Sequence, residues 1–396
     1  MTIKEETLRS LYGDMVKWRR HLHRHPELSF QEYATSDMIA GLLEEWGLEV
    51  RRGVAGTGIV AKLAGKRPGR AIALRSDIDA LPIQDAKSCD YRSAVPGVMH
   101  ACGHDGHIAE LLAVARYYSL HREETAGTRV FLFQPGEELL PGGAIRMIED
   151  GALEGVDAIY GVHLWTPMAC GTAATRPGPF MATPDEFEIE IVGRGGHGGL
   201  PHESRDALVA GAALVTALQT IVSRNLNPLE AGVLTVGRFE SGTANNVIAE
   251  RSKLSGTIRS FNMEVRSLVR KRLEEIAAHT CAMHGCDFEL NYIEGYPPVV
   301  NDEKEAARVL RKIAEQLPDS AGGLSDRVMA GEDFSYYLER KPGCFFFVGA
   351  GGENASSPHH HPGFDIEEQA MLHAARLLIA VADDSALDGG TSGDAV

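Results

Sequence analysis

The stretch TRVFLFQPGEE, residues 128–138, joins an apolar segment to a proline–glycine turn and two adjacent glutamates. A short apolar run bounded by a turn is typical of a strand that is buried on both faces of a sheet. Acidic pairs are common on protein surfaces, but a strand this apolar is expected in the interior. The stretch therefore predicts a covered sheet that carries carboxylates at the end of one strand.

Helices and strands alternate along the first part of the chain. AIALRSDIDALP, residues 71–82, and DAIYGVHLW, residues 157–165, have strand character, and residues 105–118 have helical spacing. Such alternation predicts an α/β fold with a mixed, mostly parallel sheet flanked by helices. Ligands of these folds bind at the carboxyl ends of the strands, where SDIDALP, QPGEE and GVHLW lie.

The middle of the chain follows a different order of elements. Its pattern predicts a strand, a helix, two strands, a helix and a strand, at residues 186–193, 204–224, 232–240, 253–261, 263–285 and 287–296. This βαββαβ order is the ferredoxin-like unit, and helix–strand alternation returns after it. We therefore expect a discontinuous main domain of residues 1–181 plus 296–396, and an inserted ferredoxin-like α+β domain of residues 182–295.

The composition argues against some classes of partner. The chain has 396 residues and a net charge of −16, which disfavours binding to nucleic-acid phosphates. No apolar run approaches the length of a membrane span. The first residues lack the pattern of a secretory signal, and the six scattered cysteines are expected to be thiols. We therefore predict a cytoplasmic protein that binds neither nucleic acid nor membranes.

The stretch GVMHACGHDGHIAELL, residues 97–112, concentrates side chains that bind metals. A structural zinc site would need two closely spaced Cys and His pairs, and the chain offers no second Cys-rich pair. For a single residue such as Cys102 or His107, burial in the core is the commoner role. A metal site is favoured because CGHD, Glu137–Glu138 and His163 are all predicted at one edge of the sheet. Adjacent glutamates also suit hydrolysis, since one can bind a cation while the other faces the water.

These motifs and others carry a resemblance to a known family. In order, from about residue 20 to residue 370, they are LHRHPELSFQE, LRSDIDALP, GVMHACGHDGH, FLFQPGEE, GVHLW, GGHGGLPH, NNVIAE, SGTIRS, AGEDFSYYL and HHHPGFD. The chain resembles the metal-dependent amidohydrolases of the aminoacylase, hippurate hydrolase and indole-acetyl-amino-acid hydrolase type, a dinuclear metallopeptidase-like family. The resemblance implies hydrolysis of the amide bond of N-acyl amino acids, such as acetyl or benzoyl conjugates, with release of a carboxylic acid and an amino acid.

The resemblance also implies two divalent cations per subunit, about 3.5 Å apart. Cys102 would bridge them as a thiolate. The remaining ligands would be His104 and His163 at one cation, and Glu138 with a histidine of HHHPGFD at the other. These side chains come from four distant segments, so the implied site depends on the fold.

The histidine of HHHPGFD is less sharply defined than the other ligands. The family pattern of His, any residue, Pro, any residue, an aromatic and Asp selects His360, with His361 as the alternative and His359 least favoured. Asp79 keeps the family's aspartate place and would orient ligands. Thiolate, imidazole and carboxylate ligands suit Zn²⁺ or Mn²⁺, and Co²⁺ or Ni²⁺ are also compatible.

For catalysis the resemblance assigns Glu137 as the base, which takes a proton from the attacking water and gives it to the departing amine. His197 of GGHGGLPH would stabilise the charge on the amide oxygen. In the family this histidine comes from the partner subunit, which implies a homodimer formed through the inserted domain, with a lid and dimerisation role. Gly136 stands where the family has alanine, and we expect the glycine to loosen the turn before Glu137.

Substrate recognition is assigned to the inserted domain. Arg259 would bind the substrate carboxylate, with Asn246 and His202 lining the same pocket. From spacing alone, an exposed strand arginine is an equally good interpretation of Arg259. Two other functions stay open. A dipeptidase or aminopeptidase would need an acidic group for the substrate's ammonium, and the motifs offer none; a non-catalytic conjugate-binding protein would have no need of Glu137 beside Glu138.

Overall fold

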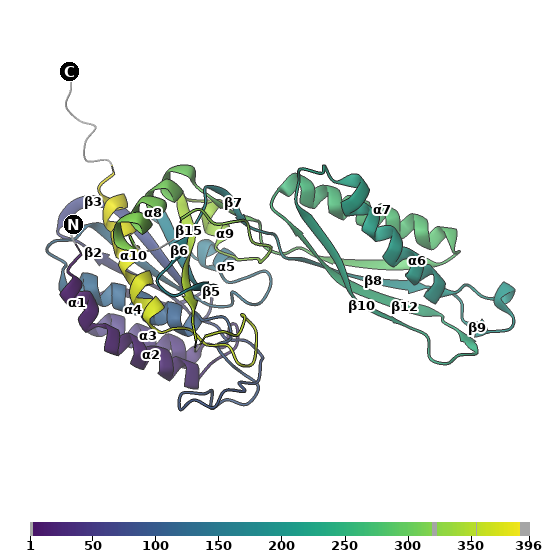
Figure 1. The fold of residues 1–396 in the computed structure, drawn as a ribbon, viewed down its shortest axis with the longest axis horizontal. Helices are drawn as coiled ribbons and strands as arrows, with labels where there is room; N and C mark the ends of the chain where they lie inside the picture. The colour runs from purple at the N-terminus through teal and green to yellow at the C-terminus, as the bar shows by residue number, and fades with distance from the viewer. Residues whose placement is uncertain (1–2, 319–322, 354, 389–396) are drawn as a thin grey trace, which may run out of the picture. The chain divides into compact units, whose positions relative to one another are not determined.

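The computed structural model describes residues 3–318, 323–353 and 355–388, and these form two compact units (Figure 1). The first unit contains the described residues of Met1–Phe180, Val300–Asp326 and Asp333–Val396. The second unit contains Met181–Val299 and Arg327–Glu332. Strands β7 (Gly178–Met181) and β14 (Val299–Asn301) pair with each other where the chain passes from one unit to the other.

A seven-stranded mixed sheet runs through the first unit. Its spatial order is β1 (Glu49–Val54), β2 (Gly58–Ala64), β4 (Ala126–Gln134), β3 (Arg67–Asp77), β5 (Ala158–Ala169), β15 (Gly343–Gly351) and β6 (Ala173–Ala174). The central strands β4, β3, β5 and β15 are parallel, as predicted. The outer pairs β1–β2, β2–β4 and β15–β6 are antiparallel. The sheet is therefore mixed, as predicted, and strands joined by a short hairpin, such as β1 and β2, pair antiparallel at its edge.

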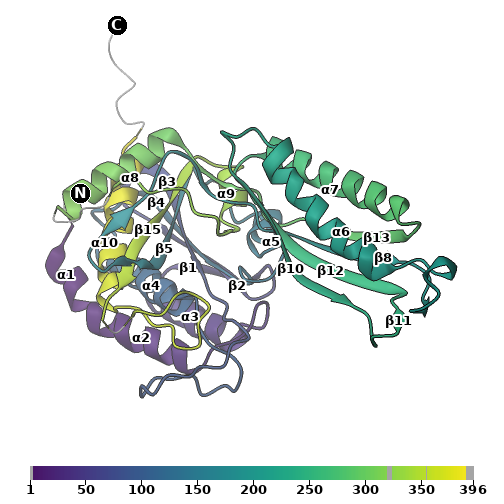
Figure 2. The same ribbon diagram turned by 45° about the vertical axis from the view of Figure 1, so that its right-hand side comes forward.

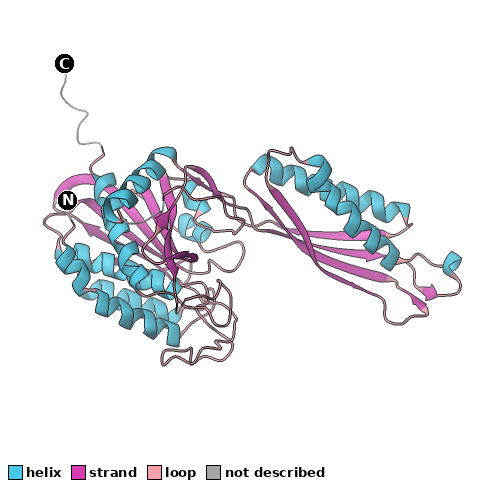
Figure 3. Cartoon of the chain, viewed as in Figure 1, coloured by secondary structure: helices cyan, strands magenta, loops and turns pink. Residues whose placement is uncertain are grey.

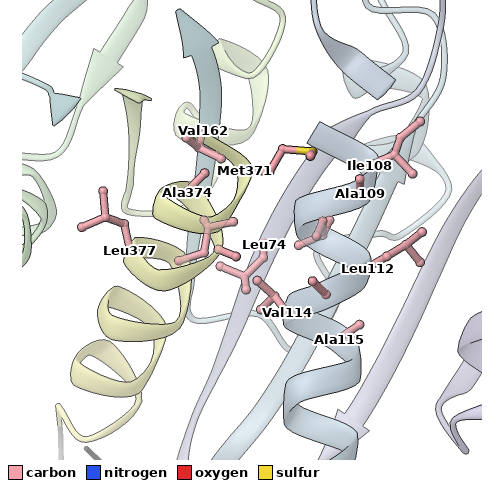
Figure 4. Close-up of a cluster of buried hydrophobic side chains, with 14 of the residues drawn as sticks. Leu74, Ile108, Ala109, Leu112, Val114, Ala115, Val162, Met371, Ala374 and Leu377 are labelled. Carbon is pink, nitrogen blue, oxygen red and sulfur yellow. The ribbon is translucent and has the colours of Figure 1, made fainter. Parts of the chain in front are cut away.

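Helices pack around this sheet (Figures 2 and 3). They are α1 (Glu5–Ser10), α2 (Tyr12–Arg24), α3 (Tyr33–Glu45), α4 (His104–Leu120), α5 (Ala144–Glu149), α8 (Glu303–Gln316), α9 (Ser335–Leu338) and α10 (Gln369–Ala386). Every residue of β15 is buried, and since successive side chains of a strand point to opposite faces, both faces of the sheet are covered there. Leu74 of β3, Leu112 of α4 and Leu377 of α10 belong to one continuous apolar core (Figure 4).

The second unit is built on a four-stranded antiparallel sheet. Its order is β10 (Gly232–Ser241), β12 (Arg251–Ser260), β8 (Asp185–Val192) and β13 (Asp287–Ile293). Along β8, Phe187, Ile189 and Ile191 are buried and alternate with glutamates that are not. The buried side chains pack with those of α6 (Ala207–Thr220), the π-helical turn η2 (Ile221–Asn225) and α7 (Met263–Met283). The predicted ferredoxin-like order of strands and helices is therefore observed within this unit.

Helix α6 is apolar on both its inner and its outer side. Residues Ala207–Asn225 are long and apolar enough to cross a membrane by length and composition alone, contrary to the expectation that no apolar run approaches that length. Leu214 and Leu218 are buried in the core of the second unit. Leu208 and Val209 are 42% and 48% exposed. The helix thus fills the core on one side and presents exposed apolar surface on the other.

Candidate metal centre

Four segments of the first unit converge at the carboxyl ends of its parallel strands. Cys102 lies just before α4, and His104 is the first residue of that helix. Glu138 follows β4 after a turn, His163 lies in β5, and His360 lies in the loop after β15. Because parallel strands end at the same edge of a sheet, side chains far apart in the sequence meet there.

The donor atoms of these five side chains lie close together. Cys102 Sγ is 3.5 Å from His163 Nε2. Glu138 Oε1 is 3.3 Å from His360 Nε2 and 3.8 Å from His104 Nε2. Two sets have donor atoms within 4.8 Å of one another, and both contain the sulfur: Cys102, His104 and His163, and Cys102, Glu138 and His360. Two groups of three donors around a common thiol can hold two cations side by side.

The unpaired atoms and ring orientations of these side chains fit the binding of metal ions. His104 Nε2 and Glu138 Oε1 are buried and have no hydrogen-bond partner among the described residues. His104 Nδ1 donates to the carbonyl of Asp79 at 2.9 Å, and His163 Nδ1 donates to the carbonyl of Leu164 at 3.0 Å. Each imidazole therefore turns Nε2 toward the cluster, in the orientation that metal-binding histidines have. Cations there would satisfy buried atoms that are otherwise costly to leave unpaired.

The electrostatics of the cluster also favour cations. Burial and the nearby carboxylates of Glu138 and Glu137 raise the pKa of the Cys102 thiol well above its usual value. Burial lowers the pKa of His104, but Asp77 and Asp79 outweigh burial and raise it to about 10. The cluster therefore concentrates negative charge around a sulfur, a charge that divalent cations would balance.

Asp77 and His107 lie next to the cluster and support it through hydrogen bonds. His107 Nδ1 donates to Asp77 Oδ1 at 2.7 Å, and His107 Nε2 accepts the backbone N–H of Leu164 at 2.9 Å. Arg75 donates to the other oxygen of Asp77 at 2.7 Å. Both nitrogens of His107 are thus engaged, so this histidine orders β5 beside His163 and leaves metal binding to its neighbours.

Asp79 joins two of the predicted ligands. Its Oδ1 is 3.3 Å from His104 Nδ1, and its Oδ2 accepts the backbone N–H of Glu138 at 3.0 Å. The hydroxyl of Ser29 donates to the same Oδ2 at 2.6 Å. The position of Asp79 agrees with an orienting role. Ser29 was not predicted, although it lies in the LSFQE motif.

The turn before Glu137 is held by residues that the sequence analysis missed. The backbone N–H of Gly136 donates to Glu32 Oε1 at 3.0 Å, and Thr57 donates to Glu32 Oε2 at 2.6 Å. Gly136 has a φ of 63°, and a Cβ there would lie 2.4 Å from the ring of Phe30. A side chain at position 136 would therefore require the Phe30 ring to move, and the expectation that glycine loosens this turn stays a prediction. Burial raises the pKa of Glu32 to about 7.

Arg19 connects two segments of the cluster. This fully buried guanidinium donates to Asp105, next to His104, at 2.8 Å, and also to Asp365 of HHHPGFD. His23 Nδ1 lies 2.8 Å from the same Asp105 carboxylate. Arg19 therefore joins the CGHD and HHHPGFD segments through two largely buried ion pairs, and His23 adds a contact to Asp105.

The other predicted residues lie in the second unit, in two places. His197 in β9 (Gly196–His197) pairs with Val247 of β11 (Val247–Ile248), and the carbonyl of Asn246 accepts the N–H of Gly198 at 2.8 Å. His202 is exposed in the short 3-10 turn η1 (Pro201–Glu203). Arg259 is in β12, where its guanidinium donates to the carbonyls of Asp185 and Ile258.

Fold and donor sets define a metal-binding α/β protein with an additional α+β unit, and comparison with known proteins gives its family. Residues 73–384 match the sequence model of the family described as Peptidase family M20/M25/M40. The chain is 41% identical to N-acetyl-L-cysteine deacetylase of Bacillus subtilis (strain 168), over 96% of this chain and 90% of that protein. It is 47% identical to N-acyl-L-amino acid amidohydrolase of Geobacillus stearothermophilus, over 73% of this chain and 78% of that protein.

A solved structure agrees with this relationship. The Bacillus subtilis YXEP protein, described as a dinuclear metal-binding peptidase from the M20 family, matches with a TM-score of 0.82 and 33% identity, over 95% of this chain and 98% of that chain. The chain therefore belongs to peptidase family M20/M25/M40.

Proposed function

We propose that this chain is a metal-dependent amidohydrolase that cleaves the amide bond of N-acyl amino acids or related conjugates and releases a carboxylic acid and an amino acid. The observation that carries the proposal is the pair of donor sets sharing Cys102, with Glu137 beside the donor Glu138. The two relatives named for N-acetyl-L-cysteine and for N-acyl-L-amino acids support this substrate class.

In this proposal two divalent cations are held by Cys102, His104, His163, Glu138 and His360. We choose His360 because its Nε2 lies 3.3 Å from Glu138 Oε1, whereas His361 Nδ1 accepts a hydrogen bond from Gly363 N. When bound, the cations acidify a water molecule and polarise the amide carbonyl. Zn²⁺ or Mn²⁺ suits this donor set best, with Co²⁺ or Ni²⁺ as alternatives.

Glu137 acts as the general base. The residue is buried, and a carboxylate oxygen lies within 4.8 Å of the donor atoms of His104 and Glu138, close enough to contact a water molecule bound between them. It accepts the proton of the attacking water and delivers it to the departing amine nitrogen. Asp79 assists by holding the ring of His104 and the backbone of Glu138.

Recognition of the substrate involves two copies of the chain. Arg259 binds the substrate carboxylate and lies near one end of β12, while Arg251 begins that strand. These residues are about 26 Å apart, eight positions at ~3.3 Å each. His197 lies beyond Arg251, because its neighbour Gly196 pairs with Ile248. This separation within one second unit supports our proposal that a partner subunit supplies His197, with Asn246 and His202 beside it.

A homodimer through the second unit accommodates this division. The exposed side chains of Leu208 and Val209 on α6, and of Phe239 on the edge strand β10, offer an apolar surface for a second copy. The first unit is then the catalytic domain and the second the lid and dimerisation domain.

A cytoplasmic location is part of the proposal, since all six cysteines are free thiols, as a reducing compartment favours.

The test is Glu137→Gln, assayed with hippurate and N-acetyl amino acids. Gln keeps the size of the side chain and removes the base, so turnover should fall at least ~100-fold while two cations per chain remain bound. Glu264→Gln, at an exposed position in the first turn of α7, is the matched control and should keep wild-type turnover. Turnover of the Glu137 variant near the wild-type rate would reject the assignment, and faster cleavage of dipeptides with a free amino terminus would favour a peptidase.

A further inference from the structure

His359 of HHHPGFD has no role in the ligand set proposed above, yet its ring touches the sulfur that both donor sets share. His359 Nδ1 lies 3.9 Å from Cys102 Sγ, within hydrogen-bonding reach of a sulfur acceptor, which is larger than oxygen. The adjacent residue, His360, instead places its Nε2 at Glu138. Two consecutive histidines therefore reach two different atoms of the same cluster.

The tautomer of His359 follows from its second nitrogen. The backbone N–H of Thr166 donates to His359 Nε2 at 3.3 Å. A ring nitrogen that accepts a hydrogen bond carries a lone pair, so the proton of the neutral imidazole sits on Nδ1. Nδ1–H then faces Cys102, where Sγ lies 3.9 Å away and the backbone also accepts from this ring. An imidazole lone pair is not available at Nδ1 to bind a cation.

The ring is held in this orientation by its neighbours. It stacks on Trp165 at 4.7 Å between centroids with 25° between the planes, and it contacts Phe364 at 4.9 Å. The backbone N–H of His360 donates to the carbonyl of Ala101 at 2.8 Å, which fastens this loop beside Cys102. His360 itself has a φ of 62°, in the left-handed region that few residues other than glycine adopt.

We propose that His359 is a positioning residue that donates a hydrogen bond from Nδ1–H to the Cys102 thiolate when that sulfur holds the cations. The proposal rests on the metal-binding function of Cys102 proposed above. Such a bond draws electron density from the sulfur and fixes its direction, as hydrogen bonds to cysteine ligands do in other metal sites. It explains why a third histidine lies next to the ligand without acting as one.

The test uses the full chain loaded with Co²⁺, whose sulfur-to-cobalt charge-transfer band reports the electron density of the thiolate. His359→Phe keeps an aromatic ring between Trp165 and Phe364 but has no N–H. His359→Asn keeps an N–H donor near the place of Nδ1. His361→Leu is the control, because His361 Nδ1 accepts from Gly363 N. His359→Leu replaces the Phe variant if the latter does not fold.

We expect His359→Phe to bind two cobalt ions with about 10-fold weaker affinity and to shift the band to longer wavelength. His359→Asn should keep the band near its wild-type position, and His361→Leu should leave it unchanged. A band at the wild-type wavelength in His359→Phe would overturn the proposal, as would the loss of one cobalt ion, which would make His359 a ligand. A wild-type protein with no charge-transfer band would instead reject Cys102 as a ligand.

Discussion

The cluster around Cys102 and the loops around His197 differ in how firmly each holds its polar side chains. In the first unit, His104, His163 and Glu138 each have a second contact that fixes them, and most of these contacts are buried. In the second unit, His197 and His202 are exposed, and the described contact of His202 is an ion pair with Glu203 at 3.9 Å.

This difference indicates that the metal site is complete within one chain, whereas the site around His197 needs a second surface. Buried donors held by fixed partners are already arranged within one chain, as metal binding requires. His197 Nδ1 accepts the backbone N–H of Gly199 at 3.0 Å, but the exposed side of its ring, like that of His202, is buried only when another surface covers it. Variants of the metal ligands in the first unit, and of the buried residues that hold them, should therefore affect metal content, and variants around His197 should affect turnover alone.

The largest expected effect is on stability in the first unit. Arg19→Met removes the guanidinium that pairs with Asp105 and Asp365, and although Lys87 still pairs with Asp365, removal of one partner from a buried ion pair costs about 3–5 kcal/mol. Urea unfolding should show this loss, together with reduced metal content. Arg20→Met is the matched control, because Arg20 is 43% exposed beside Glu368 and should cost at most about 1 kcal/mol. Equal losses for the two variants would show that the Arg19 network does not support the cluster.

Features of the fold and the site that depend on neighbouring residues could be predicted from the sequence, whereas those that depend on contacts between distant residues could not. The alternation along β8 gives its buried face directly, and the motifs place Cys102, His104, Glu138, His163 and His360 at one edge once the strands are parallel. The antiparallel edges of the large sheet depend on which strands become neighbours, and no local pattern encodes that order.

The supporting residues were missed for the same reason. Arg19 and Asp105 are 86 positions apart, and Glu32 and Gly136 are 104 positions apart. An arginine in a helix or a glutamate before one has no local sign of a buried partner, since each is usually exposed. A single sequence therefore reveals the groups that carry chemistry more readily than the groups that hold them in place.

The next effect concerns the second unit. His197→Ala should reduce turnover about 100-fold, the size expected for loss of a donor to a developing oxyanion, with the unfolding midpoint and metal content unchanged. Mixing it with the inactive Glu137→Gln variant should restore part of the activity, because a hybrid dimer contains one complete site. Hybrids that form, as seen by native mass spectrometry, but remain inactive would contradict donation across a dimer.

The smallest expected effect is on stability and concerns a buried glutamate of the first unit. Glu110 on α4 is 1% exposed, both of its oxygens have no hydrogen-bond partner among the described residues, and burial raises its pKa well above the usual value. Because the pKa of Glu110 is higher in the folded than in the unfolded protein, the folded protein loses stability as the pH rises above the ordinary pKa of 4.5. Glu110→Met should therefore stabilise the protein by about 1–3 kcal/mol, more at pH 8 than at pH 5.

Glu110→Gln separates charge from polarity in that experiment. Gln cannot ionise, so this variant should remove the dependence on pH while leaving a polar group buried. Thermal unfolding of the three proteins at both pH values gives the comparison. A Glu110→Met variant that is less stable than wild type at pH 8 would mean that the carboxyl has a favourable partner.

The central claim is that one sulfur belongs to both cation sites, and counting metal ions tests it most directly. Equilibrium dialysis followed by elemental analysis should find two divalent cations per wild-type chain and fewer than one in Cys102→Ala. Cys281→Ala, at a buried cysteine of the second unit, should keep both. A Cys102→Ala protein that is folded and still retains two cations per chain would contradict the account.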